Sequence, residues 1–169
     1  MKYIILYILL FFSGISFAQE TLSQLLKNNN SKSIPYISVQ ELAMPKTKAI
    51  LLDSRELNEF EVSHLKNAIF VGYNNFNIEQ TIKQLPNKQQ EIVVYCSLGI
   101  RSEDIAEQLT KAGFTNVKNL YGGIFEWKNR GFKVFDKDNK ETENVHTFSE
   151  QWSKWLLKGN KVFDKKQKE

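Results

Sequence analysis

The segment YCSLGIRS, residues 95–102, contains the only cysteine of the 169-residue chain, followed by a glycine after three positions and an arginine after five. Gly99 can adopt a positive φ, which lets a short loop turn backbone N–H groups inward around an anion. A helix starting directly after the loop adds positive potential, and Arg101 adds a full charge. Such surroundings lower the pKa of a thiol and favour the reactive thiolate. The segment therefore predicts that Cys96 is a nucleophile; the alternative is a buried cysteine that serves as a small apolar side chain.

Two regular elements must hold this loop. Residues 91–95 form a short apolar run typical of a strand buried on both faces. Residues 102–112 carry apolar side chains at helical spacing, and Gly113 supplies a C-terminal stop. A loop between a buried strand and a helix lies at the carboxyl edge of a parallel sheet, where open α/β folds bind their ligands. We therefore expect Cys96 at this edge.

The rest of the chain alternates between the same two kinds of element. Strands are expected at residues 37–39, 49–52, 68–71 and 117–120, and helices at residues 19–30, 56–62, 78–85 and 123–127. Ser38 is expected to cap a short helical turn that runs towards Leu42. In the helix at residues 56–62, Leu57 and Phe60 are expected to point into the core. Buried strands that alternate with helices imply a parallel sheet covered on both faces. The predicted fold class is α/β.

The first residues predict export. One lysine precedes the apolar run 3–12, and residues 16–18 give the small-x-small pattern that signal peptidases cut. The run is shorter than the about 20 residues that a membrane span needs. We expect a cleavable signal peptide at residues 1–18, a mature start at Gln19, a periplasmic or secreted protein, and no membrane span after cleavage; an uncleaved anchor is the alternative. Because oxidising compartments favour paired cysteines or none, a lone thiol there suggests a function.

Composition excludes several functional classes. The formal charge of +4 falls to +3 when Lys2 leaves with the signal peptide, and the lysines are spread along the chain, which is typical of a solvated surface and not of a nucleic-acid site. The mature chain has neither a glycine-rich phosphate loop nor a zinc-ligand spacing, so we expect no metal and no cofactor. A single cysteine also rules out an internal disulfide.

Three motifs in the same order resemble those of a known family. The segment CSLGIRS resembles the Cys-x-x-Gly-x-Arg-Ser active-site loop of single-domain rhodaneses, which are sulfurtransferases. The segment LLDSRELNEFEVSHLKNAIFV resembles their Asp-x-Arg-Glu region, with Ser63 and Leu65 in place of the usual Gly and Ile, and LYGGIFEWKNRGFKV resembles their closing Gly-Gly-x-x-x-Trp region. The resemblance implies a rhodanese-like domain at residues 36–134, preceded by a helix and linker at residues 19–35.

The resemblance implies a mechanism and a set of site residues. Cys96 would take a sulfane sulfur from thiosulfate or a persulfide, become a persulfide itself, and pass the sulfur to cyanide or a thiol. Arg101 would attract an anionic donor. The active-site loop that holds the anionic persulfide would comprise Ser97, Leu98, Gly99, Ile100 and Ser102. Asp53 and Arg55, at the end of a neighbouring strand, would support this loop.

Two other functions stay open at this point. Phosphatases and arsenate reductases of the same fold have five residues between the cysteine and the arginine, whereas this chain has four, with no acidic residue in the loop to act as a general acid. The absence of a second cysteine also removes a disulfide relay. A binding module of rhodanese fold without turnover is the other alternative.

The C-terminal extension, residues 135–169, lies beyond the resemblance. Residues 147–150 fit a capping box that would open an amphipathic helix at residues 148–158. One face of this helix would carry Phe148, Trp152, Trp155 and Leu156. This face is expected to pack on the domain, with a protein partner or a membrane as the alternative, and residues 161–169 to form a frayed end. For His64 we expect a structural hydrogen bond, and for His146 no catalytic role.

Overall fold

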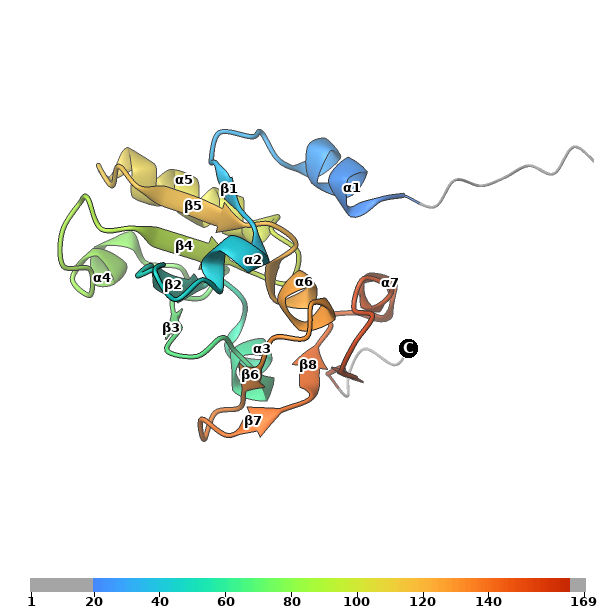
Figure 1. Ribbon diagram of the computed structural model, residues 1–169. Helices are drawn as coiled ribbons and strands as arrows, with labels where there is room; N and C mark the ends of the chain where they lie inside the picture. Colours follow the sequence, from blue (N-terminus) through green and yellow to red (C-terminus); the bar gives the residue numbers. More distant parts are fainter. Residues whose placement is uncertain (1–19, 165–169) are drawn as a thin grey trace, which may run out of the picture.

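A central sheet of five parallel strands has the order β1-β5-β4-β2-β3 (Figure 1). The computed structural model describes residues 20–164, so the predicted signal peptide and Gln19 lie outside the described residues. The strands of this sheet are β1 (Tyr36–Ile37), β2 (Ile50–Asp53), β3 (Ile69–Phe70), β4 (Ile92–Tyr95) and β5 (Val117–Leu120). The prediction of an α/β fold with a parallel sheet is confirmed.

The carboxyl ends of the two central strands meet at one edge of the sheet. β2 and β4 pair in parallel with Asp53 opposite Tyr95. Every residue of β4 is buried, because side chains pack on both faces of the sheet. Val93 and Tyr95 belong to one apolar cluster, and Ile92 and Val94 belong to the other. Cys96, the residue after Tyr95, therefore lies at the sheet edge directly after a strand that is buried on both faces.

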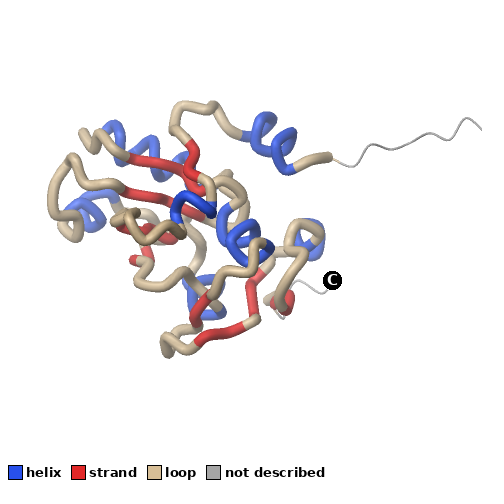
Figure 2. Tube along the Cα trace, in the orientation of Figure 1, coloured by secondary structure: helices blue, strands red, loops and turns tan. Residues whose placement is uncertain are grey.

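Helices cover both faces of the sheet (Figure 2). The helices are α1 (Leu22–Asn29), α2 (Val39–Leu42), α3 (Leu57–Val62), α4 (Ile78–Ile82), α5 (Arg101–Lys111), α6 (Gly123–Asn129) and α7 (Glu150–Ser153). Side chains of α1, α2 and α6 join one apolar cluster, whereas those of α4 and α5 pack in the other. Among residues 20–164, no helix combines the length and the apolar character that a membrane crossing requires.

Two local predictions in the first half of the chain were wrong. The Ser38 hydroxyl accepts the backbone N–H of Glu41 and caps α2, as predicted, so the strand expected at residues 37–39 already ends at Ile37. In α3, Leu57 is 53% exposed while Glu59 is 1% exposed, so a carboxylate takes the inward position that was assigned to leucine. Phe60 is partly buried, and its ring stacks on His64.

The C-terminal extension forms two small sheets. β6 (Val134–Phe135) pairs antiparallel with β7 (Glu141–Thr142), and β8 (Asn144–His146) pairs parallel with β9 (Asn160–Val162). Leu156 is 1% exposed in the apolar cluster of the domain, where Trp152 and Trp155 pack against the same cluster. The extension is therefore joined to the domain through a shared core.

The helix predicted at residues 148–158 is much shorter than expected, because α7 covers only Glu150–Ser153. Phe148 has φ +62, outside the helical region, and the predicted cap by Thr147 does not form, since that hydroxyl donates to the carbonyl of Val162. The side-chain oxygen of Asn129 then accepts the N–H groups of residues 157 and 158. The chain continues into β9, so the frayed end predicted at residues 161–169 was wrong for residues 161 and 162, while residues 165–169 lie outside the described residues.

Candidate active site

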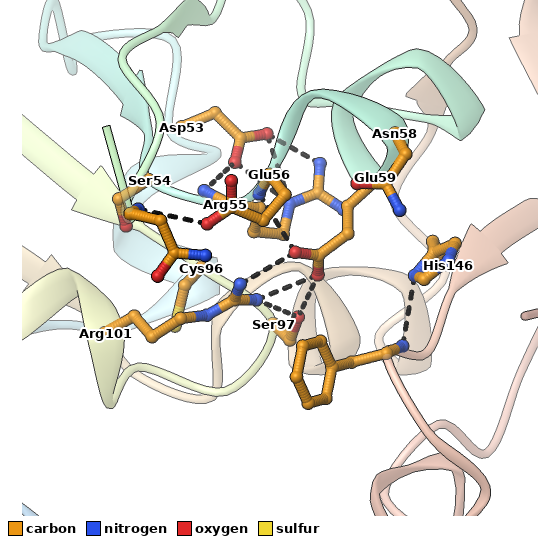
Figure 3. Close-up of polar contacts among 12 residues, drawn as sticks. Asp53, Ser54, Arg55, Glu56, Asn58, Glu59, Cys96, Ser97, Arg101 and His146 are labelled. Carbon is orange, nitrogen blue, oxygen red and sulfur yellow. Dashed lines mark hydrogen bonds and ion pairs between the residues drawn. The ribbon is translucent and has the colours of Figure 1, made fainter. Parts of the chain in front are cut away.

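The Cys96 thiol lies in the loop between β4 and α5, at the predicted sheet edge (Figure 3). The residue is 2% exposed, and its Sγ accepts the backbone N–H of Gly99 at 3.1 Å. The Ser102 hydroxyl oxygen lies 3.5 Å from the same sulfur. The loop therefore directs donors at the sulfur, as the spacing of Cys96, Gly99 and Ser102 predicts.

Gly99 has a backbone conformation that other residues rarely adopt, with φ +106. Its carbonyl accepts the side-chain amides of Asn30 and Asn119 at 2.7 and 2.8 Å. The amide oxygen of Asn119, in turn, accepts the Ser102 hydroxyl at 2.8 Å. The sequence analysis assigned no role to either asparagine. Asn119 is fully buried in β5, and a buried side-chain amide needs such polar partners. Together these hydrogen bonds hold the Cys96 loop through Gly99 and Ser102, two loop residues that do not line the pocket described below.

The start of α6 packs directly beneath the cysteine. The N–H of Ile124 donates to the Cys96 carbonyl at 2.9 Å, and the N–H of Phe125 donates to the Ser97 carbonyl at 3.2 Å. A Cβ atom on Gly123 would lie 2.2 Å from the Cys96 carbonyl oxygen, so only glycine permits this approach. Gly123 thus allows the start of α6 to hold the Cys96 loop.

The Arg101 guanidinium forms a two-point ion pair with Glu59. Nη1 donates to Oε2 at 2.7 Å and Nη2 to Oε1 at 2.8 Å, while Nη2 also lies 3.1 Å from the Ser97 hydroxyl (Figure 3). Burial raises the pKa of Glu59, but the hydrogen bonds and charge of Arg101, helped by Arg55 and the Glu56 N–H, outweigh burial and lower the pKa to about 2. Glu59 therefore stays ionised at neutral pH and offsets the charge of Arg101.

The pKa of the Cys96 thiol is lowered from its ordinary value. Burial alone raises this pKa, because a thiolate is costly away from water. The positive charge of Arg101 acts in the opposite direction, together with hydrogen bonds from Ser102 and Gly99, and these effects prevail. The site thus favours the thiolate without a histidine as base.

Asp53 and Arg55 form a fully buried ion pair beside the loop. The Arg55 guanidinium donates to Asp53 at 2.6 Å and to the Ser63 carbonyl at 2.6 Å, and it lies 5.7 Å from the centre of the Tyr95 ring. The direct link between the strand ends is made by Ser54, whose N–H and hydroxyl both reach the Tyr95 carbonyl. The pair therefore braces the residue that precedes Cys96.

A pocket of about 180 Å³ opens in front of the thiol. Its lining consists of Cys96, Ser97, Leu98, Ile100, Arg101, Phe148 and Trp152. The loop residues were predicted, but the two aromatic residues were assigned only to packing. Their position could not follow from the helical spacing, because Phe148 lies outside the helix.

The histidines take no part in the pocket lining. The His64 ring stacks on Phe60 with centroids 4.1 Å apart, and its Nδ1 lies 3.2 Å from the Phe60 carbonyl, in line with the predicted structural role. His146 is buried, and its Nδ1 accepts the Phe148 N–H at 3.1 Å. Within residues 20–164, the His, Cys, Asp and Glu side chains form no group of three or more that could hold a metal ion.

The fold and the site define a protein with a single thiol, of lowered pKa, in a loop at the edge of a parallel α/β sheet. The family model of the rhodanese-like domain matches residues 38–130, which is more than half of the chain. The chain therefore belongs to the rhodanese-like domain family, and the resemblance predicted from the three motifs is confirmed.

Relatives carry names that include sulfurtransferases. The thiosulfate sulfurtransferase GlpE of Coxiella burnetii is 30% identical over 97 residues, covering 57% of this chain and 87% of the relative. The adenylyltransferase and sulfurtransferase UBA4 of Candida albicans is 37% identical over 87 residues, with 48% of this chain and 20% of the relative covered. A tRNA uridine(34) hydroxylase of Hamiltonella defensa is 38% identical over 87 residues, with 47% and 23% covered. The chain thus matches most of the first relative and a minor part of the other two.

Solved structures share the fold. A rhodanese-related protein from Thermoplasma volcanium has a TM-score of 0.52 and 26% identity, over 59% of this chain and 96% of that protein. A thiosulfate sulfurtransferase from Pseudomonas aeruginosa has a TM-score of 0.56 and 20% identity, over 73% of this chain and 23% of that protein. At the latter identity the likeness concerns the fold alone.

Proposed function

We propose that the protein is a rhodanese-type sulfurtransferase that carries sulfane sulfur as a persulfide on Cys96. The observation that carries this proposal is the single thiol at the base of a pocket, with the Gly99 N–H at 3.1 Å and the Ser102 hydroxyl at 3.5 Å from its sulfur. Membership of the family and the names of its relatives support it.

The transfer divides into two displacement steps. The Cys96 thiolate attacks the sulfane sulfur of the donor, the S–S bond of the donor breaks, and the leaving group departs with the bonding electrons as sulfite or a thiolate. The persulfide, Cys96–S–S⁻, keeps the negative charge near the loop donors, which stabilise it as an oxyanion hole stabilises an alkoxide. Cyanide or a thiolate then attacks the outer sulfur, and the Cys96 thiolate is released.

Phosphoryl transfer fits the pocket less well. Among the described residues that line it, none is acidic, so a general acid for the leaving group is missing. The nearby carboxylate of Glu59 has a pKa of about 2 and is held by Arg101, so it carries no proton to donate at neutral pH. Both features support sulfur transfer over the phosphatase alternative.

A mass measurement tests the proposal. Incubation with thiosulfate or a hydropersulfide should add one sulfur, about 32 Da, to the intact protein, and cyanide should remove it. Cys96→Ser should abolish the adduct while leaving the circular dichroism spectrum unchanged. Folded wild-type protein that gains no sulfur from any donor would contradict the proposal and favour the binding module without turnover.

We also propose that the protein is exported, on the strength of its first 18 residues alone. Expression of the full chain should give a periplasmic or secreted form that begins at Gln19 by N-terminal sequencing. An exported form that retains Met1 would contradict cleavage and favour the uncleaved anchor.

A further inference from the structure

The pocket in front of Cys96 takes part of its wall from outside the family domain. The family match ends at residue 130, yet Phe148 and Trp152 of the extension line the same pocket as the thiol. The other side chains of the wall, Leu98 and Ile100, come from the loop itself. The space of about 180 Å³ is smaller than a typical drug-sized site, so it suits a substituent of a few heavy atoms.

The positive charge in this pocket is offset before any substrate enters. Arg101 is the only charged side chain among the described residues that line it, and the ionised Glu59 binds it at two points. The Phe148 ring covers the guanidinium, with 5.4 Å between Cζ and the ring centroid. A dianion such as thiosulfate would lose its hydration on entering the pocket, and no unpaired positive charge there would compensate for that loss.

The position of the Phe148 ring is set by its backbone. Phe148 has φ +62, a conformation that is uncommon for an aromatic residue and persists where the surroundings enforce it. A tight turn encloses Phe148, because the N–H of Ser149 donates to the Thr147 carbonyl at 2.7 Å. The N–H of Phe148 itself donates to Nδ1 of the buried His146 at 3.1 Å. The unusual turn places the ring over Arg101 at the mouth of the pocket.

We propose that Phe148 and Trp152 determine the choice of donor, so that the pocket accepts a small hydropersulfide, R–S–SH, whose substituent R is apolar and uncharged. This inference rests on the sulfurtransferase function proposed above. The Cys96 thiolate attacks the outer sulfur of R–S–SH, the S–S bond of the donor breaks, and the bonding electrons leave on the inner sulfur, so that Cys96–S–SH and R–S⁻ result without net oxidation. Each methylene of R that is buried in the pocket adds roughly fourfold in affinity.

A matched pair of donors tests the inference. Propyl hydropersulfide and 2-sulfonatoethyl hydropersulfide carry the same reacting sulfurs and differ in the charge at the end of a short chain. The rate at which each adds a sulfur to Cys96 is followed by intact mass, and it is divided by the rate with N-acetylcysteine to remove intrinsic reactivity. Wild-type protein should prefer the propyl donor by about tenfold, and thiosulfate should be slower still.

Variants then assign the preference to the aromatic wall. Phe148→Ala and Trp152→Ala should each lower the preference by about threefold or more, mainly by slowing the propyl donor. Phe148 is 43% exposed, so its truncation leaves the core intact. Leu157→Ala, at a site in the same extension that is 78% exposed and outside the pocket lining, is the control and should leave the preference unchanged.

The possible outcomes distinguish a failure of this inference from a failure of the proposed sulfurtransferase function. Equal normalised rates for the two hydropersulfides, or a preference that survives in Phe148→Ala, would overturn the role of the aromatic wall while sulfur transfer stands. Failure of every donor to modify folded wild-type protein would overturn both.

Discussion

Replacing Glu59 by glutamine should weaken the fold by a calculable amount. The Glu59 side chain is 1% exposed and its pKa falls from the usual 4.5 to about 2, so the full shift contributes to stability. At about 1.4 kcal/mol for each pH unit between the two values, the contribution is about 3 kcal/mol. A glutamine side chain would also place its NH₂ group, a hydrogen-bond donor, opposite the Arg101 N–H groups, so one of the two hydrogen bonds to Arg101 would be lost. We expect Glu59→Gln to lower the free energy of unfolding at pH 7 by about 3 kcal/mol.

The same shift predicts a dependence on pH with a definite sign. Because the folded-state pKa is lowered, the stabilisation is fully present above about pH 4.5 and is lost as the pH falls towards 2. Urea denaturation of wild type and Glu59→Gln should therefore give a difference that decreases from about 3 kcal/mol at pH 7 to about 1.5 kcal/mol at pH 3.

An exposed ion pair provides the matched control. Glu141 pairs with Lys133 at 2.6 Å, but the two side chains are 47% and 67% exposed, so Glu141→Gln should change the free energy of unfolding by less than about 1 kcal/mol. A Glu59→Gln effect as small as that of the control, or one independent of pH between 5 and 3, would refute the assignment of Glu59 as a buried, ionised partner of Arg101.

Three further outcomes are expected. Leu156→Ala should lower the free energy of unfolding in urea by about 2–5 kcal/mol, whereas Leu157→Ala next to it, 78% exposed, should change it by less than about 0.5 kcal/mol. Gly123→Ala should destabilise more than Gly131→Ala and slow sulfur loading in the mass assay, because both have a positive φ but only Gly123 meets backbone within 4 Å. Arg101→Ala should raise the pKa of the loop thiol, which slows its alkylation by iodoacetamide at pH 7.

The position of the Cys96 loop was predictable because its determinants are local. Cys96, Gly99 and Ser102 lie within one short segment, and the apolar run before them specifies the strand that holds them. Glu59 was missed for the opposite reason. It lies far from Arg101 along the chain, and its helix also offers Leu57, which is more apolar but exposed. Only the packing of α3 against the loop decides which side chain points inward.

The extension shows where helical spacing misleads. Its apolar residues do face the domain, as Leu156 shows, but the backbone between them is not one helix. The pairing of β8 with β9 joins residues distant in sequence and takes up the Thr147 N–H, which donates to Val162 at 2.9 Å. Such long-range pairing leaves no periodic signal, so the aromatic wall of the pocket could not be located in advance.

Helix α6 connects the Cys96 loop to the C-terminal extension by hydrogen bonds at its two ends. At its first turn the N–H of Ile124 holds the Cys96 carbonyl, and at its last turn the Asn129 side chain holds the carbonyl of Trp155 and the N–H of Leu157. Seven helical residues span only about 10 Å, too short a rod to bend appreciably. We therefore expect a crosslink in the extension, its truncation or a molecule bound to it to change the position of the Cys96 loop as well as that of the pocket wall.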